Sequence, residues 1–464
     1  MVDQNLVREK LFQKYIEPTK KKRQEYVGIE IEMPVINLDK QPVDFAKIHA
    51  LTAGFMERFQ FEAESRDEDG NVNAAKNPEN GDILSYDCSY NNLELSLGKE
   101  KELDALYERF AEYYTYIEEE LAKSHYTLTG LGVNPYRKYN RNVPVPNGRY
   151  RMLFHHLSSY PKYAELPMYF HEYPNYGMFS SASQVQLDVD YEDLPKTIRA
   201  FSRLEPIKAL LFNNSILTGE HEELACCRDM FWENSTHGIN PHNIGMFDCE
   251  IETVEDLKAY IESTSMYCVE KDGKYINFPP IPVMEYFAKD EIEGEYYADG
   301  SYHTITFQPA IEDLDYLRTF KFEDLTFRGT IEFRSVCCQP ISDVMTVSAF
   351  HLGLKNELDE LDRLLEEDHV LYHHGYSATE LRKLFVKQEV PSFVDNDALD
   401  ELAGQVVDLA RRGLEKRGYG EEKYLEPLYD RIKKRQNPAN RMLCQMRADG
   451  DIEKVIIEYA KLYA

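Results

Sequence analysis

The chain has 464 residues, 43% of them hydrophobic, so it can bury a large core within about two to four domains. Asp and Glu number 82 against 53 Lys and Arg, and the net charge of −29 argues against nucleic acid or an anionic membrane as a partner. No apolar run approaches the roughly 18 residues of a membrane span, and no signal peptide is visible. The charge does not exclude ATP, because metal ions and a local arginine cluster can offset the field.

The number and spacing of the cysteines bear on the cellular compartment of the protein. Eight are present without a CxxC motif, which argues against a zinc ribbon or a thioredoxin-type site. Reduced cysteines in a cytoplasmic protein are the simplest interpretation. Two adjacent pairs, Cys226-Cys227 and Cys337-Cys338, suggest either a redox switch or inert buried thiols, and the latter interpretation is favoured.

Hydrophobic periodicity predicts the main elements in chain order. Alternation of apolar and polar residues predicts strands over residues 26–38, 82–97 and 183–189. Apolar residues at helical spacing predict helices over residues 45–59, 100–123 and 194–214. An Asp-Gly pair at Asp69-Gly70 predicts a hairpin turn. From Val344 the apolar spacing is helical to the end of the chain.

Acidic residues recur with a period of two on predicted strands. That period puts Glu30 and Glu32 on one face of the first strand, and Glu332 and Arg334 on one face of another. Together with Glu94 they offer four carboxylates, which suit a hard cation such as Mg²⁺ or Mn²⁺ and, through it, phosphate. For each Glu alone, the solvated face of an antiparallel strand is the alternative. Arg334 beside Glu332 favours phosphate chemistry on a metal.

A series of short motifs carries a resemblance to a known family. In chain order they are Gly28 through Glu32, Asp87 through Glu94, Gly130 through Pro135, Pro146 through Tyr150, Gln184 through Asp188, Leu211 through Ser215, Arg228 with Trp232, Met266-Tyr267 with Lys274-Tyr275-Ile276, His303 with Phe307, and Glu332 with Arg334. In this order they resemble the glutamate–cysteine ligase superfamily of carboxylate–amine ligases, and in particular its plant and proteobacterial branch. The resemblance covers about residues 25–355.

The resemblance implies an α+β, glutamine-synthetase-like fold. A mainly antiparallel curved sheet would form the active-site funnel, with helices on the outside. It places a glutamate–cysteine ligase-like catalytic domain at residues 1–355. Residues 356–464 would form a C-terminal helical region packed on that domain. The sequence favours no oligomeric state.

The resemblance also implies a reaction and a cofactor. An ATP-dependent ligase would join the γ-carboxylate of L-glutamate to the amine of L-cysteine through γ-glutamyl phosphate, the first step of glutathione-type synthesis. ATP and a carboxylate repel each other, so about two or three Mg²⁺ ions, or Mn²⁺, would bridge them. The residues carried over as metal ligands are Glu30, Glu32, Asp87, Glu94, Gln184 and Glu332. Glu332 and Arg334 are the candidate catalytic residues, with Arg334 gripping the transferred phosphoryl group.

Five residues are candidates for substrate binding: Arg149, Gln186, Arg228, Tyr267 and His303. The two arginines suit a carboxylate or phosphate, with a structural ion pair or a surface position as the alternative. Gln186 would reach the substrate or be solvated. Tyr267 would line the acceptor pocket or pack within its hairpin, and His303 would orient phosphate or fill a polar cavity.

The chain departs from the family pattern near the substrate positions. Gln186 stands where the family usually has Asn. The second Arg that usually follows the Arg228 and Trp232 motif is not in register, and His237 and Asn240 lie nearby instead. Two alternatives therefore stay open. One is a related carboxylate–amine ligase with a different amine acceptor or donor acid. The other is a non-catalytic ligand-binding relative, against which the intact set of carboxylates argues.

Overall fold

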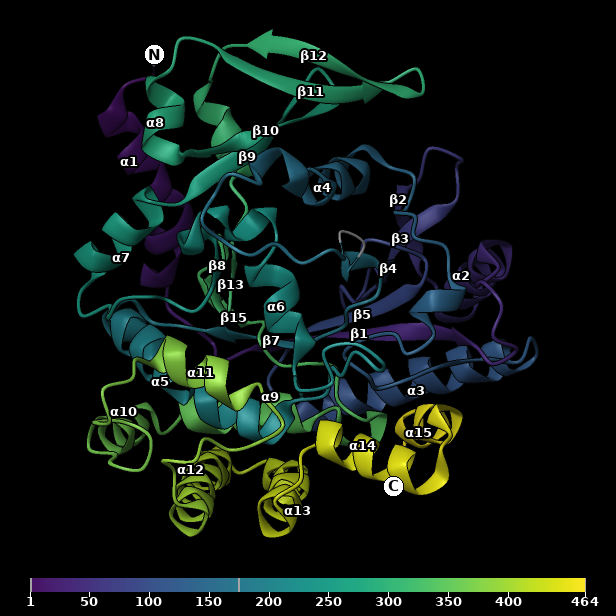
Figure 1. The fold of residues 1–464 in the computed structure, drawn as a ribbon, viewed down its shortest axis with the longest axis vertical. Coiled ribbons are helices and arrows are strands. Elements are labelled where there is room, and N and C mark those ends of the chain that lie inside the picture. Colours follow the sequence, from purple (N-terminus) through teal and green to yellow (C-terminus); the bar gives the residue numbers. More distant parts are fainter. Residues whose placement is uncertain (1, 174–175, 464) are drawn as a thin grey trace.

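Within residues 2–173 and 176–463, which the computed structural model describes, nine strands form one antiparallel sheet in the order β14-β15-β7-β1-β5-β4-β3-β2, with β6 beside β1 (Figure 1). The strands are β1 (Val27–Asn37), β2 (Glu62–Arg66), β3 (Val72–Lys76), β4 (Ile83–Tyr86), β5 (Asn92–Glu100), β6 (Tyr126–Leu128), β7 (Ser183–Asp188), β14 (Glu323–Leu325) and β15 (Thr330–Phe333). The long central strand β1 pairs with β5 on one side and with β7 on the other.

The apolar face of this sheet forms the main core. Ile29 and Ile31 of β1 are buried in one cluster with Leu95 of β5. The helices against this face are α2 (Phe45–Phe59), α3 (Leu103–Ala122), α5 (Leu194–Phe212) and α9 (Thr346–Lys355), which lie below the sheet or beside it in Figure 1. In α3, residues such as Leu106 and Phe110 enter the same cluster, because four-residue spacing puts them on one face.

A second layer lies across the opposite, polar face. A smaller sheet, in the order β12-β11-β10-β9, is built from β9 (Ser265–Lys271), β10 (Lys274–Pro282), β11 (Ile292–Ala298) and β12 (Ser301–Phe307). It packs with α1 (Gln4–Leu11) and α8 (Val283–Ala288) around its own apolar cluster. The helix α4 (Gly148–Ser158) contacts β10 and lies between the two sheets in Figure 1.

Helices follow α9 to the end of the described chain. They are α10 (Leu358–Glu366), α11 (Ala378–Phe385), α12 (Asn396–Arg417), α13 (Glu426–Lys434), α14 (Pro438–Asp449) and α15 (Ile452–Tyr459). The apolar cluster under the central sheet continues through Leu399 and Leu414 to Leu428. Core residues on both sides of residue 355 therefore pack together, and a catalytic domain ending there stays a prediction.

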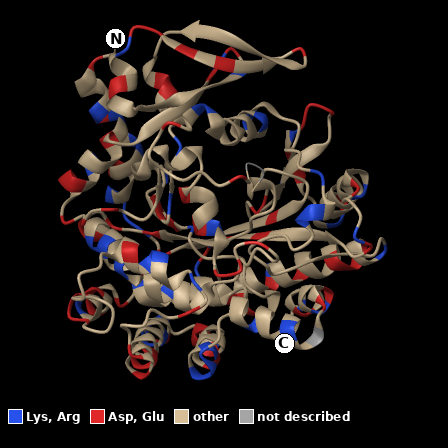
Figure 2. Cartoon of the chain, in the orientation of Figure 1, with Lys and Arg blue, Asp and Glu red and all other residues tan. Residues whose placement is uncertain are grey.

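Acidic and basic residues occur along the whole chain. Figure 2 shows acidic and basic residues interspersed on the outer helices, with acidic residues also on the strands of the central sheet. No helix of the described residues is long and apolar enough to cross a membrane.

Most predicted elements are confirmed. The first strand is β1, the helix at 45–59 is α2, and Gly70 takes the left-handed conformation, with φ +85°, between β2 and β3. The prediction of one strand over 82–97 is wrong in one respect. The chain leaves the sheet after β4 and returns at β5, with Cys88 left-handed at φ 60° in the connection. Alternation alone does not reveal this break, because apolar residues continue through it.

The contact between α9 and α12 supplies a test of the fold. A methyl group at Gly353 of α9 would overlap the carbonyl of Ala410 in α12. A methyl group at Gly404, which also lies in α12, would meet no described atom within 4 Å. We expect Gly353→Ala to lower the free energy of unfolding by about 1–3 kcal/mol through this overlap. The control Gly404→Ala should raise it by about 0.5–1 kcal/mol through helix propensity. Urea titration measures both, and equal effects would contradict the packing of α12 on α9.

Candidate active site

The polar face of the central sheet carries the predicted acidic residues. Directly opposed residues of neighbouring strands share a face, so strand register fixes which side chains meet. The pairs are Glu32 with Glu94, Glu30 with Gln184, Glu332 with Gln186, and Asp324 with Glu332. The prediction that these carboxylates share one face is thus confirmed by register. Asp324 on β14 joins the row and was not predicted.

Amide side chains hold the carboxylates in place. Gln184 Nε2 donates to Glu32 Oε1 over 2.7 Å. Gln186 Nε2 donates to Glu30 Oε1 over 2.9 Å and to Glu332 Oε1 over 2.7 Å. At the far end of the row the Arg334 guanidinium pairs with Glu332. These amides keep like-charged groups at fixed positions, which prepares the face to bind cations.

Burial sets the electrostatics of the row. It raises the pKa of Glu32 to about 8 and that of Glu94 to about 7, and the nearby Asp87 carboxylate adds to both shifts. The pKa of Glu30 also rises well above its ordinary value, through burial and then through Glu332. Burial likewise opposes ionisation of Glu332, but the Arg334 guanidinium outweighs it and lowers the pKa of that carboxyl. Cations would relieve the repulsion among these groups.

The oxygen atoms present fit a hard divalent cation. Gln184 Oε1 is buried without a hydrogen-bond partner, which costs free energy unless a donor or a cation is supplied. Carboxylate and amide oxygens are the ligands that Mg²⁺ prefers. In the described residues no three His, Cys, Asp or Glu side chains already form a closed metal-binding group. Gln186 bonds Glu30 through Oε1, and carboxylate oxygens have further lone pairs, so these side chains keep acceptor capacity for a metal.

A cavity opens beside the row, between the central sheet and the layer above it. Of the predicted site residues it is lined by Glu32, Asp87, Arg149, Gln184, Arg228, Tyr267 and Arg334. Glu30, Glu94, Gln186 and Glu332 adjoin it on the same face of the sheet. One wall is aromatic and includes Trp232, Tyr275 and Phe320. The cavity thus joins an acidic floor to cationic and aromatic walls.

Arg228 is a buried cation with spare hydrogen-bond capacity. It lies on α6 (Cys227–Glu233) and is 7% exposed. Nη1 donates to the carbonyl of Ser335 over 3.2 Å, whereas Nε is buried without a partner. Among the described residues it has no carboxylate within ion-pair distance, since Asp229 turns to another arginine. A guanidinium held in this way suits an anionic ligand.

The other substrate candidates divide between the cavity and the surface. Arg149 lies in the first turn of α4, with its guanidinium 5.4 Å from the Tyr150 ring centroid. Tyr267 on β9 stacks on His156 at 4.2 Å and lines the cavity. The structure does not bring His303 to this site. His303 is exposed on β12, and its Nε2 lies 3.1 Å from the carbonyl oxygen of Ala298. Strand β12 is the edge strand of the smaller sheet, and α4 lies between the hairpin of β11 and β12 and the central sheet in Figure 1.

Two further arginines reach the site without having been predicted. Arg318 lines the cavity, and Arg328 Nη2 donates to Gln186 Oε1 over 2.8 Å. Neither lies in a motif of the resemblance. Arg328 is six residues before Arg334, in the turn between β14 and β15, so a prediction of that hairpin would have brought it next to the row.

Comparison with known proteins agrees with this fold and site. The chain belongs to the glutamate–cysteine ligase family 2 (GCS2), whose sequence model matches residues 26–458. It is therefore a ligase. The chloroplastic glutamate–cysteine ligase of Medicago truncatula is 23% identical over 427 residues, covering 87% of this chain and 74% of the relative. That of Nicotiana tabacum is 24% identical over 426 residues, covering 87% and 72%.

A solved structure confirms the predicted α+β fold. It is a glutamate–cysteine ligase from Francisella tularensis in complex with AMP, with a TM-score of 0.54 and 11% sequence identity. The similarity covers 95% of this chain and 88% of that one. The described chain shares its arrangement of helices around an antiparallel sheet.

The raised pKa values of the acidic row predict a pH-dependent effect of metal. Because Glu94 has a higher pKa when folded than when unfolded, its contribution to stability is present below about pH 4.5 and is lost as the pH rises through about 7. We expect Mg²⁺ to raise the melting temperature of the protein more at pH 8 than at pH 6, and Glu94→Gln to reduce that increase.

A matched control separates metal binding from burial alone. Glu118 of α3 also has a pKa raised to about 7 by burial. Its carboxylate, however, accepts hydrogen bonds from the Thr127 hydroxyl and the Leu128 amide, on the apolar side of the central sheet. Glu118→Gln should therefore leave the effect of Mg²⁺ intact. An equal response to Mg²⁺ in Glu94→Gln and wild type would remove Glu94 from the metal site.

Proposed function

We propose that this protein is an ATP-dependent ligase that joins the γ-carboxylate of L-glutamate to the amine of L-cysteine through γ-glutamyl phosphate. The observation that carries the proposal is the acidic row ending at the Arg334–Glu332 pair, beside a cavity that Arg149, Arg228 and Arg318 also line. Family membership and the names of the plant relatives support the donor and the acceptor. The AMP bound to the Francisella tularensis protein supports the nucleotide.

The reaction has two steps. A γ-carboxylate oxygen of glutamate attacks the γ-phosphorus of ATP, and ADP leaves. The amine of the acceptor then attacks the acyl carbon, and phosphate leaves with that carboxylate oxygen. About two or three Mg²⁺ ions, when bound, supply the positive charge that lets ATP approach a carboxylate. Residues proposed to hold them are Glu30, Glu32, Asp87, Glu94, Gln184 and Glu332, with Mn²⁺ as an alternative ion.

Arg334 is proposed to hold the transferred phosphoryl group. Its guanidinium lines the cavity and is fixed by Glu332, so its remaining N–H groups can donate to phosphoryl oxygens. A planar fork suits that geometry, and it stabilises charge that develops as the phosphoryl group moves. Glu332 would both orient this arginine and bind a cation.

The cavity walls are proposed to bind the amino acids. Arg228 and Arg149 supply positive charge for the α-carboxylate of the donor, and Tyr267 belongs to the aromatic wall near the acceptor. Such a wall excludes water, which protects an acyl phosphate from hydrolysis. Gln186 hydrogen-bonds carboxylates of the row, so we propose that it orients the floor of the cavity.

One observation favours a related ligase with a different donor acid or acceptor amine. The second Arg that the family usually has is not in register here; His237 lies nearby instead, and burial lowers its pKa to about 3. This imidazole is therefore neutral near pH 7 and does not replace the charge of an arginine. Arg318, on the cavity wall, is the cation available in its place.

A screen of ADP release distinguishes the two activities. The protein with ATP and Mg²⁺ is given L-glutamate, L-aspartate or another dicarboxylic amino acid, each with L-cysteine and with simple amines. We expect L-glutamate with L-cysteine to give the fastest release. A faster pair would support the related ligase, and no release above the blank with any pair would contradict a ligase.

The role of Arg228 predicts a selective change in substrate affinity. A charge-assisted pair of arginine and carboxylate is worth roughly 1.5–3 kcal/mol. We therefore expect Arg228→Ala to raise the KM for L-glutamate by about 10–150-fold with little change in that for ATP. Arg151→Ala is the control, because Arg151 lies in the same helix as Arg149 but pairs with Glu68. An equal rise in the KM for ATP would show that Arg228 binds phosphate instead.

A further inference from the structure

A carboxylate on the cavity wall stands next to the proposed substrate arginine. Asp229 follows Arg228 in α6 and lines the same cavity. If it were free, this carboxylate would offset the positive charge of Arg228 and repel an acidic substrate. Both of its oxygens instead face Arg382. Arg382 Nε donates to Asp229 Oδ2 over 2.8 Å, and Nη2 donates to Oδ1 over 3.1 Å.

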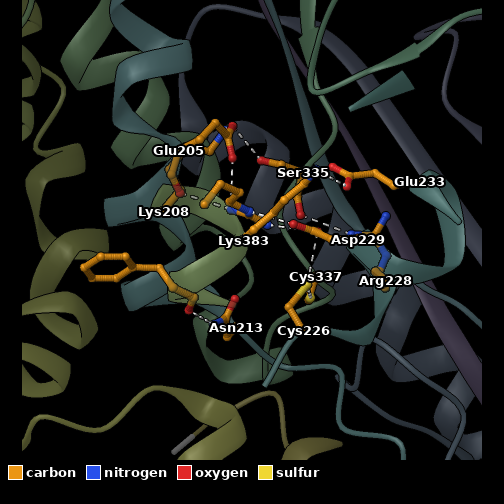
Figure 3. Close-up of polar contacts among 12 residues, drawn as sticks. Glu205, Lys208, Asn213, Cys226, Arg228, Asp229, Glu233, Ser335, Cys337 and Lys383 are labelled. Carbon is orange, nitrogen blue, oxygen red and sulfur yellow. Dashed lines mark hydrogen bonds and ion pairs between the residues drawn. The ribbon is translucent and has the colours of Figure 1, made fainter. Parts of the chain in front are cut away.

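Arg382 belongs to α11, in the C-terminal helical region, 153 residues after Asp229. It is 3% exposed. Its Nη1 donates to Glu205 Oε2 of α5 over 2.9 Å, so the guanidinium joins two buried carboxylates from two helices. Glu205 also pairs with Lys208, which balances the charge of this buried group (Figure 3).

Ser335 completes a closed circuit of contacts around Arg228. Its hydroxyl donates to Glu205 Oε1 over 2.9 Å, and its carbonyl accepts from Arg228 Nη1 over 3.2 Å (Figure 3). Ser335 directly follows Arg334 in the chain. The circuit therefore links Arg228, proposed to bind the amino acid, and the segment that follows Arg334 to α11 through Arg382.

We propose that Arg382 is a positioning residue that withdraws the Asp229 carboxylate from Arg228 and so keeps Arg228 available for the carboxylate of the amino-acid substrate. In this way α11 supports the active site without touching substrate. The assignment of that substrate rests on the proposed function, whereas the pair of hydrogen bonds from Arg382 to Asp229 does not depend on it.

The test compares Arg382→Lys with Lys383→Gln. Lysine keeps the charge beside Glu205 but loses the planar fork that holds Asp229. Lys383 is the next residue of α11 and pairs at 3.5 Å with Glu233, which does not line the cavity. We expect Arg382→Lys to raise the KM for L-glutamate by about 10-fold or more, with the KM for ATP unchanged and Lys383→Gln like wild type.

Removing the competing charge should reverse this effect. We expect Asp229→Asn to keep the KM for L-glutamate within about threefold of wild type, and Asp229→Asn with Arg382→Lys to return it to that range. A residue that is merely structural would not be rescued in this way. A raised KM in Asp229→Asn, no rescue in the double variant, or no change in Arg382→Lys would each overturn the proposal.

Hydrogen exchange of the α6 amides, residues 227–233, gives a measurement that needs no substrate. Arg382→Lys should speed their exchange by about 10-fold or more, and Lys383→Gln should not. If wild type does not use L-glutamate, the proposed function fails. The positioning role of Arg382 is then tested by α6 exchange and by repeating the KM comparison with the donor acid that does give ADP release. Unchanged α6 exchange in Arg382→Lys would overturn that role.

Discussion

Glu30, Glu32, Glu94 and Glu332 lie on one face of the central sheet, where Glu32 and Glu332 are buried, Glu30 and Glu94 are half-buried, and water solvates all four poorly. That face must be held by strand register, since a slip by one residue would turn every carboxylate into the apolar core. It must also be neutralised. In the described chain the Arg334 guanidinium supplies positive charge and amide hydrogen bonds stabilise the carboxylates, and divalent cations would add positive charge during the proposed reaction.

The two layers of the molecule follow from this constraint. Below the sheet, α3, α5 and α9 bury its apolar side, and a single cluster runs on through the C-terminal helices. Above it, α4, α6 and the smaller sheet enclose the acidic face and bring arginines and aromatic rings over it. The C-terminal helices thus contribute both to the core and, through Arg382, to the shape of the cavity.

Local sequence patterns predicted the floor of the site better than its walls. A period of two on β1 was enough to put Glu30 and Glu32 on one face. Arg318 and Arg382 carried no such signal, because lining a cavity and, for Arg382, pairing with Asp229 far along the chain arise only from tertiary packing. His303 fits a motif of the family but lies on an edge hairpin, because a short motif does not fix how the hairpin that carries it packs.

The central claim is that this acidic face transfers a phosphoryl group to a carboxylate. The most direct test uses L-glutamate labelled with ¹⁸O in its γ-carboxylate, together with ATP, Mg²⁺ and L-cysteine, and mass spectrometry of the phosphate released. The account predicts one ¹⁸O atom in each phosphate, because the carboxylate oxygen leaves with phosphorus when the amine attacks. Release of unlabelled phosphate at the same rate as γ-glutamyl product would contradict it.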